Sequence, residues 1–206
     1  MNKRILIALT VLIVSCWAQR SDTPSEPEIS SDQYQVFAAA LDFFHNAHIA
    51  THPLIANRTS SFECGSTCNG MTMGGCNGLQ GNGESPQERL QIVRRDLPKV
   101  QPTTVSDFIT KNKQCASIDA KIPTQHRYFK FGLSHADPTP SGWEHADFFY
   151  FSRVGFNPEH AQALVHVSFI SGTNGNDSGG KYLLFTKTNG QWKREGSSVV
   201  WQLTAQ

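Results

Sequence analysis

The chain has 206 residues, with 18 Lys and Arg against 17 Asp and Glu, 38% hydrophobic residues and 17% charged residues. This composition is typical of one globular domain and excludes a disordered or collagen-like chain. The net charge of +1 and the lack of a Lys- and Arg-rich run exclude a nucleic-acid-binding protein of the usual basic kind. The long apolar run at residues 5–14 is too short for a transmembrane helix, which needs about 20 residues.

The N-terminus is typical of an export signal. Residues 1–18 combine Lys3 and Arg4 with the apolar run and a small or polar end. Cys16 closes an Ile-Val-Ser-Cys string, which resembles the bacterial lipobox, in which the cysteine becomes the lipidated first residue. The Cys-Trp-Ala string that starts there also suits ordinary cleavage and release. The lipobox is the favoured interpretation, so we expect an exported protein in the periplasm or cell envelope, anchored to a membrane through Cys16.

A spacer is expected between this signal and the folded domain. Residues 19–33 are rich in Ser, Pro and Glu and have few apolar side chains. Burial would not offset the conformational entropy lost on ordering them, so they predict a flexible tether. Residues 34–206 are then expected to form a single domain.

Helical patterns dominate the first half of that domain. From residue 30, apolar side chains recur at intervals of three and four, with Ser and Asp available as N-caps. This helix is expected to end before Pro53, and residues 54–59 can form a short strand. A second helix is predicted from Ser85, with Pro86 at its first position, and a third over residues 104–113.

The last 80 residues change to an alternation of period two, rich in β-branched and aromatic residues. Strands are predicted at residues 126–131, 146–156, 162–170, 181–187 and 191–201. The connections are short, including an Asn189-Gly190 turn, so neighbouring strands are expected to be antiparallel. The pattern predicts an α+β domain, with the N-terminal helices packed on one face of a C-terminal antiparallel β-meander.

An unusual loop carries most of the cysteines. Residues 64–83 are rich in Gly and Asn and show no periodicity, which favours an irregular loop. Once Cys16 is lipidated or removed, an even number of cysteines is left, and in an exported chain this predicts disulfides. The four cysteines allow three connectivities, and the choice stays open; they are Cys64, Cys68, Cys76 and Cys115. Exported thiols are usually oxidised, so a copper site in this Met-containing loop is disfavoured and no metal or cofactor is expected.

Two His-x-Asp triplets are the best candidates for catalysis. His135 and Asp137, and His145 and Asp147, would each face the same way on extended backbone, as a base and its orienting partner must. They support an alternative hypothesis, a small periplasmic hydrolase or metal-dependent enzyme that uses residues 135–147. The turn-rich sequence around them favours an ordinary polar loop instead.

A group of histidines near the end of the first helix is a second candidate. His45, His48 and His52 share one helix face, and the spacing of the last two would let them bind one metal ion. No base or carboxylate ligand accompanies them, so the favoured interpretation is a polar helix end. Nucleophile-elbow and phosphate-binding motifs are also missing from the sequence.

Three short strings in the strand region resemble a known sequence pattern. The chain contains SRVGFN at residues 152–157, ALV-V at residues 163–167 and NG-W at residues 189–192. These strings resemble a pattern of exported bacterial proteins, some of them lipoproteins, of uncharacterised function. The resemblance implies the fold and export, and it implies no activity. The chain departs from the pattern at residues 171–178, which contain no cysteine, so no disulfide is implied there.

Taken together, these features predict a non-enzymatic, lipid-anchored domain outside the cytoplasm. The glycine-rich loop and a sheet edge or open sheet face are expected to engage a partner protein or a small molecule. A membrane is expected as a partner through the anchor, and nucleic acid is not.

Overall fold

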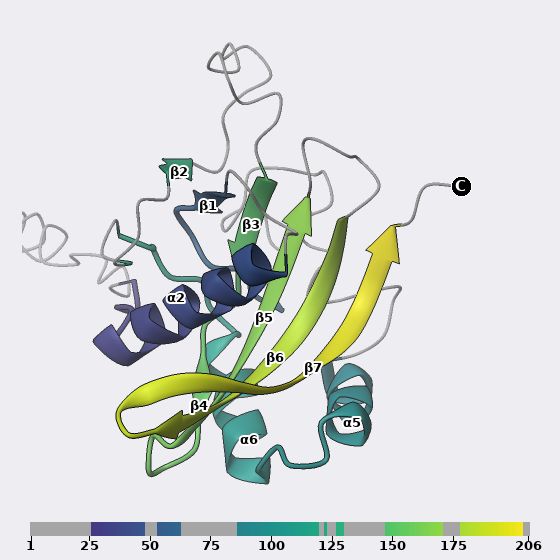
Figure 1. Cartoon of the computed structure of the whole chain (residues 1–206). Coiled ribbons are helices and arrows are strands. Elements are labelled where there is room, and N and C mark those ends of the chain that lie inside the picture. Colours follow the sequence, from purple (N-terminus) through teal and green to yellow (C-terminus); the bar gives the residue numbers. More distant parts are fainter. Residues whose placement is uncertain are drawn as a thin grey trace, which may run out of the picture.

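The computed structural model describes residues 26–47, 53–62, 86–119, 122, 127–129, 147–170 and 178–203 (Figure 1). Its helices are α2 (Ser31–Asn46), α5 (Pro86–Asp96) and α6 (Pro102–Lys111). Its strands are β1 (Pro53–Ala56), β2 (Arg127–Phe129), β3 (Asp147–Phe151), β4 (Gly155–Phe156), β5 (Gln162–Ile170), β6 (Ser178–Thr188) and β7 (Gln191–Leu203). The helices precede most of the strands, so the predicted α+β class is confirmed.

The sheet has the order β2-β1-β3-β5-β6-β7, and the short strand β4 pairs with β5. Strands β3, β5, β6 and β7 are antiparallel neighbours, as predicted. The prediction of a purely antiparallel meander is wrong, because β1 lies between β2 and β3 and runs parallel to both. The prediction assumed short connections between neighbouring strands. The connection between β2 and β3, residues 130–146, is long, so these two strands need not be adjacent and β1 can lie between them.

The helices cover both faces of the sheet, which corrects the prediction of one covered face (Figure 1). Successive residues of β5 point to opposite faces. Val165 packs in one core cluster with α2 residues such as Phe37. Leu164 packs in a second cluster with residues of α5 and α6, including Leu90 and Phe108. Residues 162–169 of β5 are all buried, and the strand carries apolar side chains on both sides.

The N-terminus of α2 shows that part of the predicted tether belongs to the fold. Ile29 is buried in the core, and the side chain of Ser30 caps α2 by accepting a hydrogen bond from the Gln33 backbone N–H. Glu26 also forms an ion pair with Arg58, at 2.6 Å. The low apolar content of residues 19–33 did not predict this, because residues 26–30 are held on the domain by a single buried isoleucine and by polar contacts. Residues 19–25 lie outside the described residues.

The hairpin between β6 and β7 matches its predicted turn. Asn189 and Gly190 both have positive φ angles, 52° and 77°, which suit the two-residue turn that joins right-twisted strands. In the described parts of the chain, no helix has the length and hydropathy that crossing a membrane requires.

Candidate functional site

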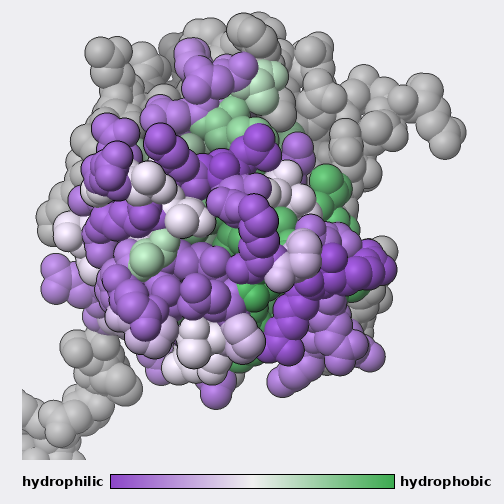
Figure 2. All heavy atoms as spheres, turned by 60° about the horizontal axis from the view of Figure 1, so that its bottom comes forward, coloured by the Kyte–Doolittle hydropathy of each residue, from purple (hydrophilic) through white to green (hydrophobic). Residues whose placement is uncertain are grey.

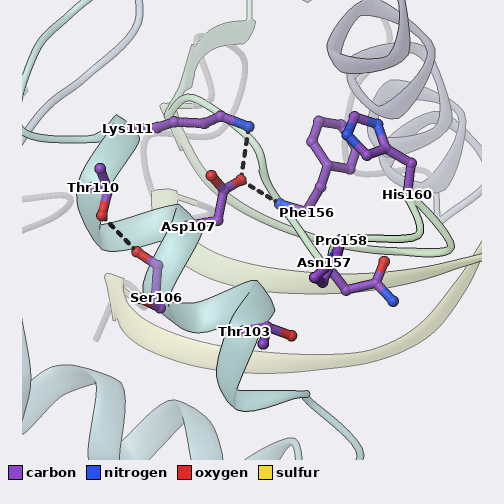
Figure 3. Close-up of a pocket in the computed structure, with 9 residues that line it drawn as sticks. All are labelled: Thr103, Ser106, Asp107, Thr110, Lys111, Phe156, Asn157, Pro158 and His160. Atoms are coloured by element: carbon purple, nitrogen blue, oxygen red, sulfur yellow. Dashed lines mark hydrogen bonds and ion pairs between the residues drawn. The ribbon is translucent and has the colours of Figure 1, made fainter.

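A pocket of about 400 Å³ lies between helix α6 and the turn that joins β4 to β5 (Figure 3). It is at the end of the molecule turned forward in Figure 2, where hydrophilic residues cover most of the described surface. The residues that line it are Thr103, Ser106, Asp107, Thr110, Lys111, Phe156, Asn157, Pro158 and His160.

One wall of the pocket is the polar side of α6. Thr103, Ser106 and Thr110 recur at intervals of three and four, so their hydroxyl groups lie along one helix face. Val105 and Phe108 form the opposite, buried face and pack against the sheet. The amphipathic pattern of α6 thus presents a row of hydroxyl groups to the pocket.

A carboxylate on α6 ties this wall to the sheet. Asp107 Oδ2 accepts a hydrogen bond from the Phe156 backbone N–H at 2.7 Å. The same oxygen forms an ion pair with Lys111 Nζ, also at 2.7 Å (Figure 3). The Lys111 ammonium lies 4.9 Å from the centroid of the Phe156 ring. Because the two charges inside the pocket neutralise each other, the pocket has little net charge of its own.

The other wall is a turn held by the side chain of Asn157. Its Oδ1 accepts hydrogen bonds from the backbone N–H groups of Ala161 and Gln162, both at 2.8 Å. Its Nδ2 donates to Glu159 Oε2 at 2.7 Å and to Gln101 Oε1 at 3.2 Å. Asn157 is only 3% exposed, so this network is a structural one that fixes the shape of the turn.

His160 sits on this turn in a strained backbone conformation. Its φ is 50°, a left-handed value that costs a non-glycine residue about 1–2 kcal/mol. Its ring stacks on Phe156 with a centroid distance of 4.8 Å and an interplanar angle of 6°. Its Nδ1 lies 3.1 Å from Asp32 Oδ2. The ring is therefore positioned by two contacts at the edge of the pocket, and such strain is typical of functional positions.

Asp32 connects three elements through its carboxylate. It lies in the first turn of α2 and contacts His160 on the β4–β5 turn and Lys187 at the end of β6, whose Nζ is 3.0 Å from Oδ1. Burial alone would raise the pKa of Asp32. The hydrogen bonds from Lys187 and His160 outweigh burial, and the pKa of Asp32 is lowered. The carboxylate is thus charged at neutral pH and bound to structural partners.

The SRVGFN string is a structural junction next to the pocket. The Arg153 backbone N–H donates to Asn112 Oδ1 at 2.8 Å, and the Val154 N–H donates to Gln33 Oε1 at 3.1 Å. A Cβ on Gly155 would lie 2.5 Å from backbone atoms of Phe108, so α6 approaches the chain closely there. A side chain of α2 and that of the residue that caps the C-terminus of α6 therefore accept hydrogen bonds from the backbone between β3 and β4.

The structure describes only two of the histidine and aspartate candidates that the sequence suggested. Of the two triplets, only Asp147 is described, and it is buried at the start of β3. His45 is exposed in the last turn of α2. Outside the described residues lie Cys16, Cys64, Cys68, Cys76, His48, His52, His135, Asp137 and His145.

Cys115 lies in the described part and is half-buried and disulfide-bonded. The pairing of the four cysteines stays a prediction. Among the described residues, no group of three or more His, Cys, Asp or Glu side chains is arranged to hold a metal ion.

Sequence reasoning missed the pairing of Asp32 with His160. The two residues are 128 positions apart, so no local sequence pattern links them. Comparison of the chain with family models, curated proteins and solved structures found no match.

Proposed function

We propose that the protein is an exported, lipid-anchored binding domain that holds a small, neutral, hydroxyl-bearing molecule in the pocket between α6 and the β4–β5 turn. The observation that carries this proposal is the pairing of charges in a preformed pocket. Asp107 and Lys111 neutralise each other, while three hydroxyl groups of α6 line the pocket. The Thr110 hydroxyl donates to the Ser106 backbone carbonyl at 3.0 Å and can still accept a hydrogen bond from a ligand, and those of Thr103 and Ser106 can donate or accept one.

The proposal favours binding over catalysis because the groups best suited to proton transfer already hold the fold. Asp107 accepts from Lys111 and from the Phe156 backbone, and His160 is coupled to Asp32. A binding site gains from such fixed groups, since less conformational entropy is lost when the ligand arrives.

Anchoring rests on the leader and on the position of Cys16 behind an apolar run. Intact mass spectrometry of the full chain expressed in a bacterium tests it. We expect a product that begins at Cys16 and carries the mass of a diacylglyceryl or triacyl group, and the Cys16→Ser variant should lose this mass. A lipid-free product that begins near residue 19 would contradict the anchor and leave the binding proposal to its own test.

Ligand binding is tested by NMR titration of the purified protein with neutral mono- and disaccharides. We expect saturable shifts at the amides of Ser106, Thr110 and His160. The double variant Ser106→Ala and Thr110→Val should weaken binding about tenfold, through loss of two hydrogen bonds. Thr188→Val removes an exposed hydroxyl elsewhere and should change nothing. Equal binding by all three proteins would contradict the proposed pocket.

A further inference from the structure

The imidazole of His160 has one nitrogen bound within the fold and one at the pocket. Its Nδ1 lies 3.1 Å from Asp32 Oδ2 on α2. Its ring is stacked on Phe156, which fixes the plane of the ring. One ring nitrogen is turned toward α2 and the other toward the side of the pocket formed by Phe156 and Lys111 (Figure 3). Because Nδ1 is the nitrogen that meets α2, the one on the pocket side is Nε2.

The carboxylate of Asp32 determines which of these two nitrogens carries a proton. The carboxylate is charged at neutral pH, so its oxygens can only accept hydrogen bonds. Its Oδ1 accepts from Lys187 Nζ, and its Oδ2 accepts from His160. Nδ1 of His160 must therefore be the protonated nitrogen, and in a neutral imidazole Nε2 is then a hydrogen-bond acceptor.

A ligand in the pocket can reach Nε2. The side chain of His160 is 53% exposed. In the described part of the chain, it forms a side-chain hydrogen bond through Nδ1 alone. The hydroxyl groups of Thr103 and Ser106 on the facing wall can turn to donate or to accept, whereas a bare Nε2 can only accept. Nε2 thus adds a hydrogen bond of fixed direction to an otherwise adaptable site.

The charged groups on the elements around His160 all have partners among the described residues. They are Asp32 of α2, Lys187 of β6, Asp107 and Lys111 of α6, and Glu159 of the same turn. Of the described residues that line the pocket, His160 is the one histidine. Histidine is the side chain that ordinarily gains a proton between about pH 8 and pH 5, and a protonated ring has a donor at both nitrogens. Acid should therefore convert Nε2 from an acceptor into a donor.

We propose that Asp32 fixes His160 as a hydrogen-bond acceptor in the pocket, so that at neutral pH the site selects a ligand whose hydroxyl group donates to Nε2. A methyl ether at the same position of the ligand cannot donate and is rejected. This specificity rests on the pocket function proposed above and names the ligand group that the pocket recognises. Asp32 is a positioning residue here, since it acts through His160.

The first test needs no ligand. NMR of the whole protein with isotopically labelled histidine shows which ring nitrogen carries the proton. At about pH 8 we expect His160 to be protonated at Nδ1 and bare at Nε2. A neutral ring that carries its proton on Nε2 would overturn the proposal, whether or not the pocket binds a sugar.

The second test measures the preference for a donor. The probes are methyl glucoside and each of its mono-O-methyl ethers, titrated into the whole protein. At about pH 8 we expect at least one ether to bind about tenfold more weakly than the parent sugar, as for the loss of one hydrogen bond. At about pH 5 the two affinities should come within about twofold of each other. Equal ratios at the two pH values would overturn the proposal.

The outcomes of this titration separate the two proposals. If none of these sugars binds, the proposed pocket function is contradicted and the selectivity with it. If the sugars bind without a preference for the hydroxyl group, the pocket function stands and the role of His160 is overturned.

Asp32→Asn separates the direction of the hydrogen bond from the bulk of the methyl group. The amide oxygen of the new side chain accepts from Lys187, so its NH₂ group faces His160 and donates to Nδ1. Nε2 then carries the proton and becomes a donor at about pH 8. The rejected ether should regain binding to within about twofold of the parent sugar, although its bulk is unchanged. An ether rejected as strongly by this variant as by the unsubstituted protein would overturn the proposal.

A pair of matched histidine variants completes the test. His160→Asn removes Nε2 and keeps a residue that tolerates the left-handed φ, so the preference for the hydroxyl group should be lost. His45→Asn is the control, because His45 is exposed in the last turn of α2, about 20 Å along the helix from Asp32. It should keep the tenfold preference and its pH dependence. Loss of the preference in both variants, or in neither, would overturn the role of His160.

Discussion

The two ends of β6 use the same side chain in different ways. Lys187 lies 5.2 Å from the centroid of the Trp192 ring and 3.0 Å from Asp32 Oδ1. Lys181 lies 5.8 Å from the centroid of the Phe169 ring, yet in the described part of the chain it has no carboxylate partner. Contact with an aromatic ring is common to both ends, so the carboxylate partner is what distinguishes the two lysines.

At the end of β6 near Lys187, the charged side chains form ion pairs with one another. Asp32, His160 and Asp107 all have partners there, and backbone N–H groups of the SRVGFN segment donate hydrogen bonds to side chains of α2 and α6. Mutations at this end should therefore cost stability, whereas mutation of Lys181 should leave the fold intact. The variants below test this contrast, from the largest expected effect to the smallest.

Gly155→Ala should damage the paired end most. The new Cβ would lie 2.5 Å from backbone atoms of Phe108, so β4 or α6 must move, and we expect a loss of about 3 kcal/mol in the free energy of unfolding. Urea denaturation measures this loss. Gly190→Asn is the control, because nothing lies within 4 Å of its Cβ and Asn tolerates positive φ. An unchanged midpoint for Gly155→Ala would contradict the close approach of α6.

Asn157→Ala should be the next most severe change. It removes two acceptor contacts to backbone N–H groups at a buried position, and we expect a loss of about 2–3 kcal/mol. Asn157→Asp keeps the accepting oxygen, but it also places a second carboxylate 2.7 Å from Glu159 Oε2, and the two repel when both are charged. The aspartate variant should therefore retain more stability than the alanine variant below about pH 4, where carboxyl groups are protonated. Thermal denaturation of the three proteins checks this order. Equal stability of the aspartate and alanine variants would show that the accepted hydrogen bonds contribute little.

These contacts also show which features the sequence can predict. Ser30, Pro86 and the Asn189-Gly190 turn act locally, so they indicated helix starts and a hairpin that the structure contains. The insertion of β1 between β2 and β3 depends on pairing between distant segments, and no local pattern encodes it.

The candidate site was harder to predict for the same reason. The polar face of α6 is readable from its spacing, but it becomes a pocket only because the turn of Asn157 and His160 lies beside it. Asp32 had a local role as a helix-cap candidate, and its partners come from two later segments of the chain. Long-range pairing of charges, rather than residue type, thus determines which polar groups are structural.

Asp32→Asn should have a moderate effect that depends on pH. The pKa of Asp32 is lowered in the folded protein, so the carboxylate stabilises the fold above about pH 4 and this contribution is lost as the pH falls through the folded pKa. We expect a loss of about 1 kcal/mol at pH 7, which becomes smaller as the pH falls through the folded pKa. Urea denaturation across this pH range measures it. A loss of the same size at pH 2 would show that the charge is not its cause.

Lys181→Met and Lys187→Met compare the two ends of β6 directly. Lys187→Met leaves Asp32 without one of its two partners and should destabilise the protein by about 1 kcal/mol. Lys181→Met keeps an apolar stem beside Phe169 and removes a charge that burial and Arg194 disfavour, so stability should stay within about 0.5 kcal/mol or rise slightly. Thermal denaturation at pH 7 gives both values. If Lys181→Met proved as destabilising as Lys187→Met, the contrast between the two ends would be wrong, because the charge of Lys181 would then stabilise the fold without a carboxylate partner.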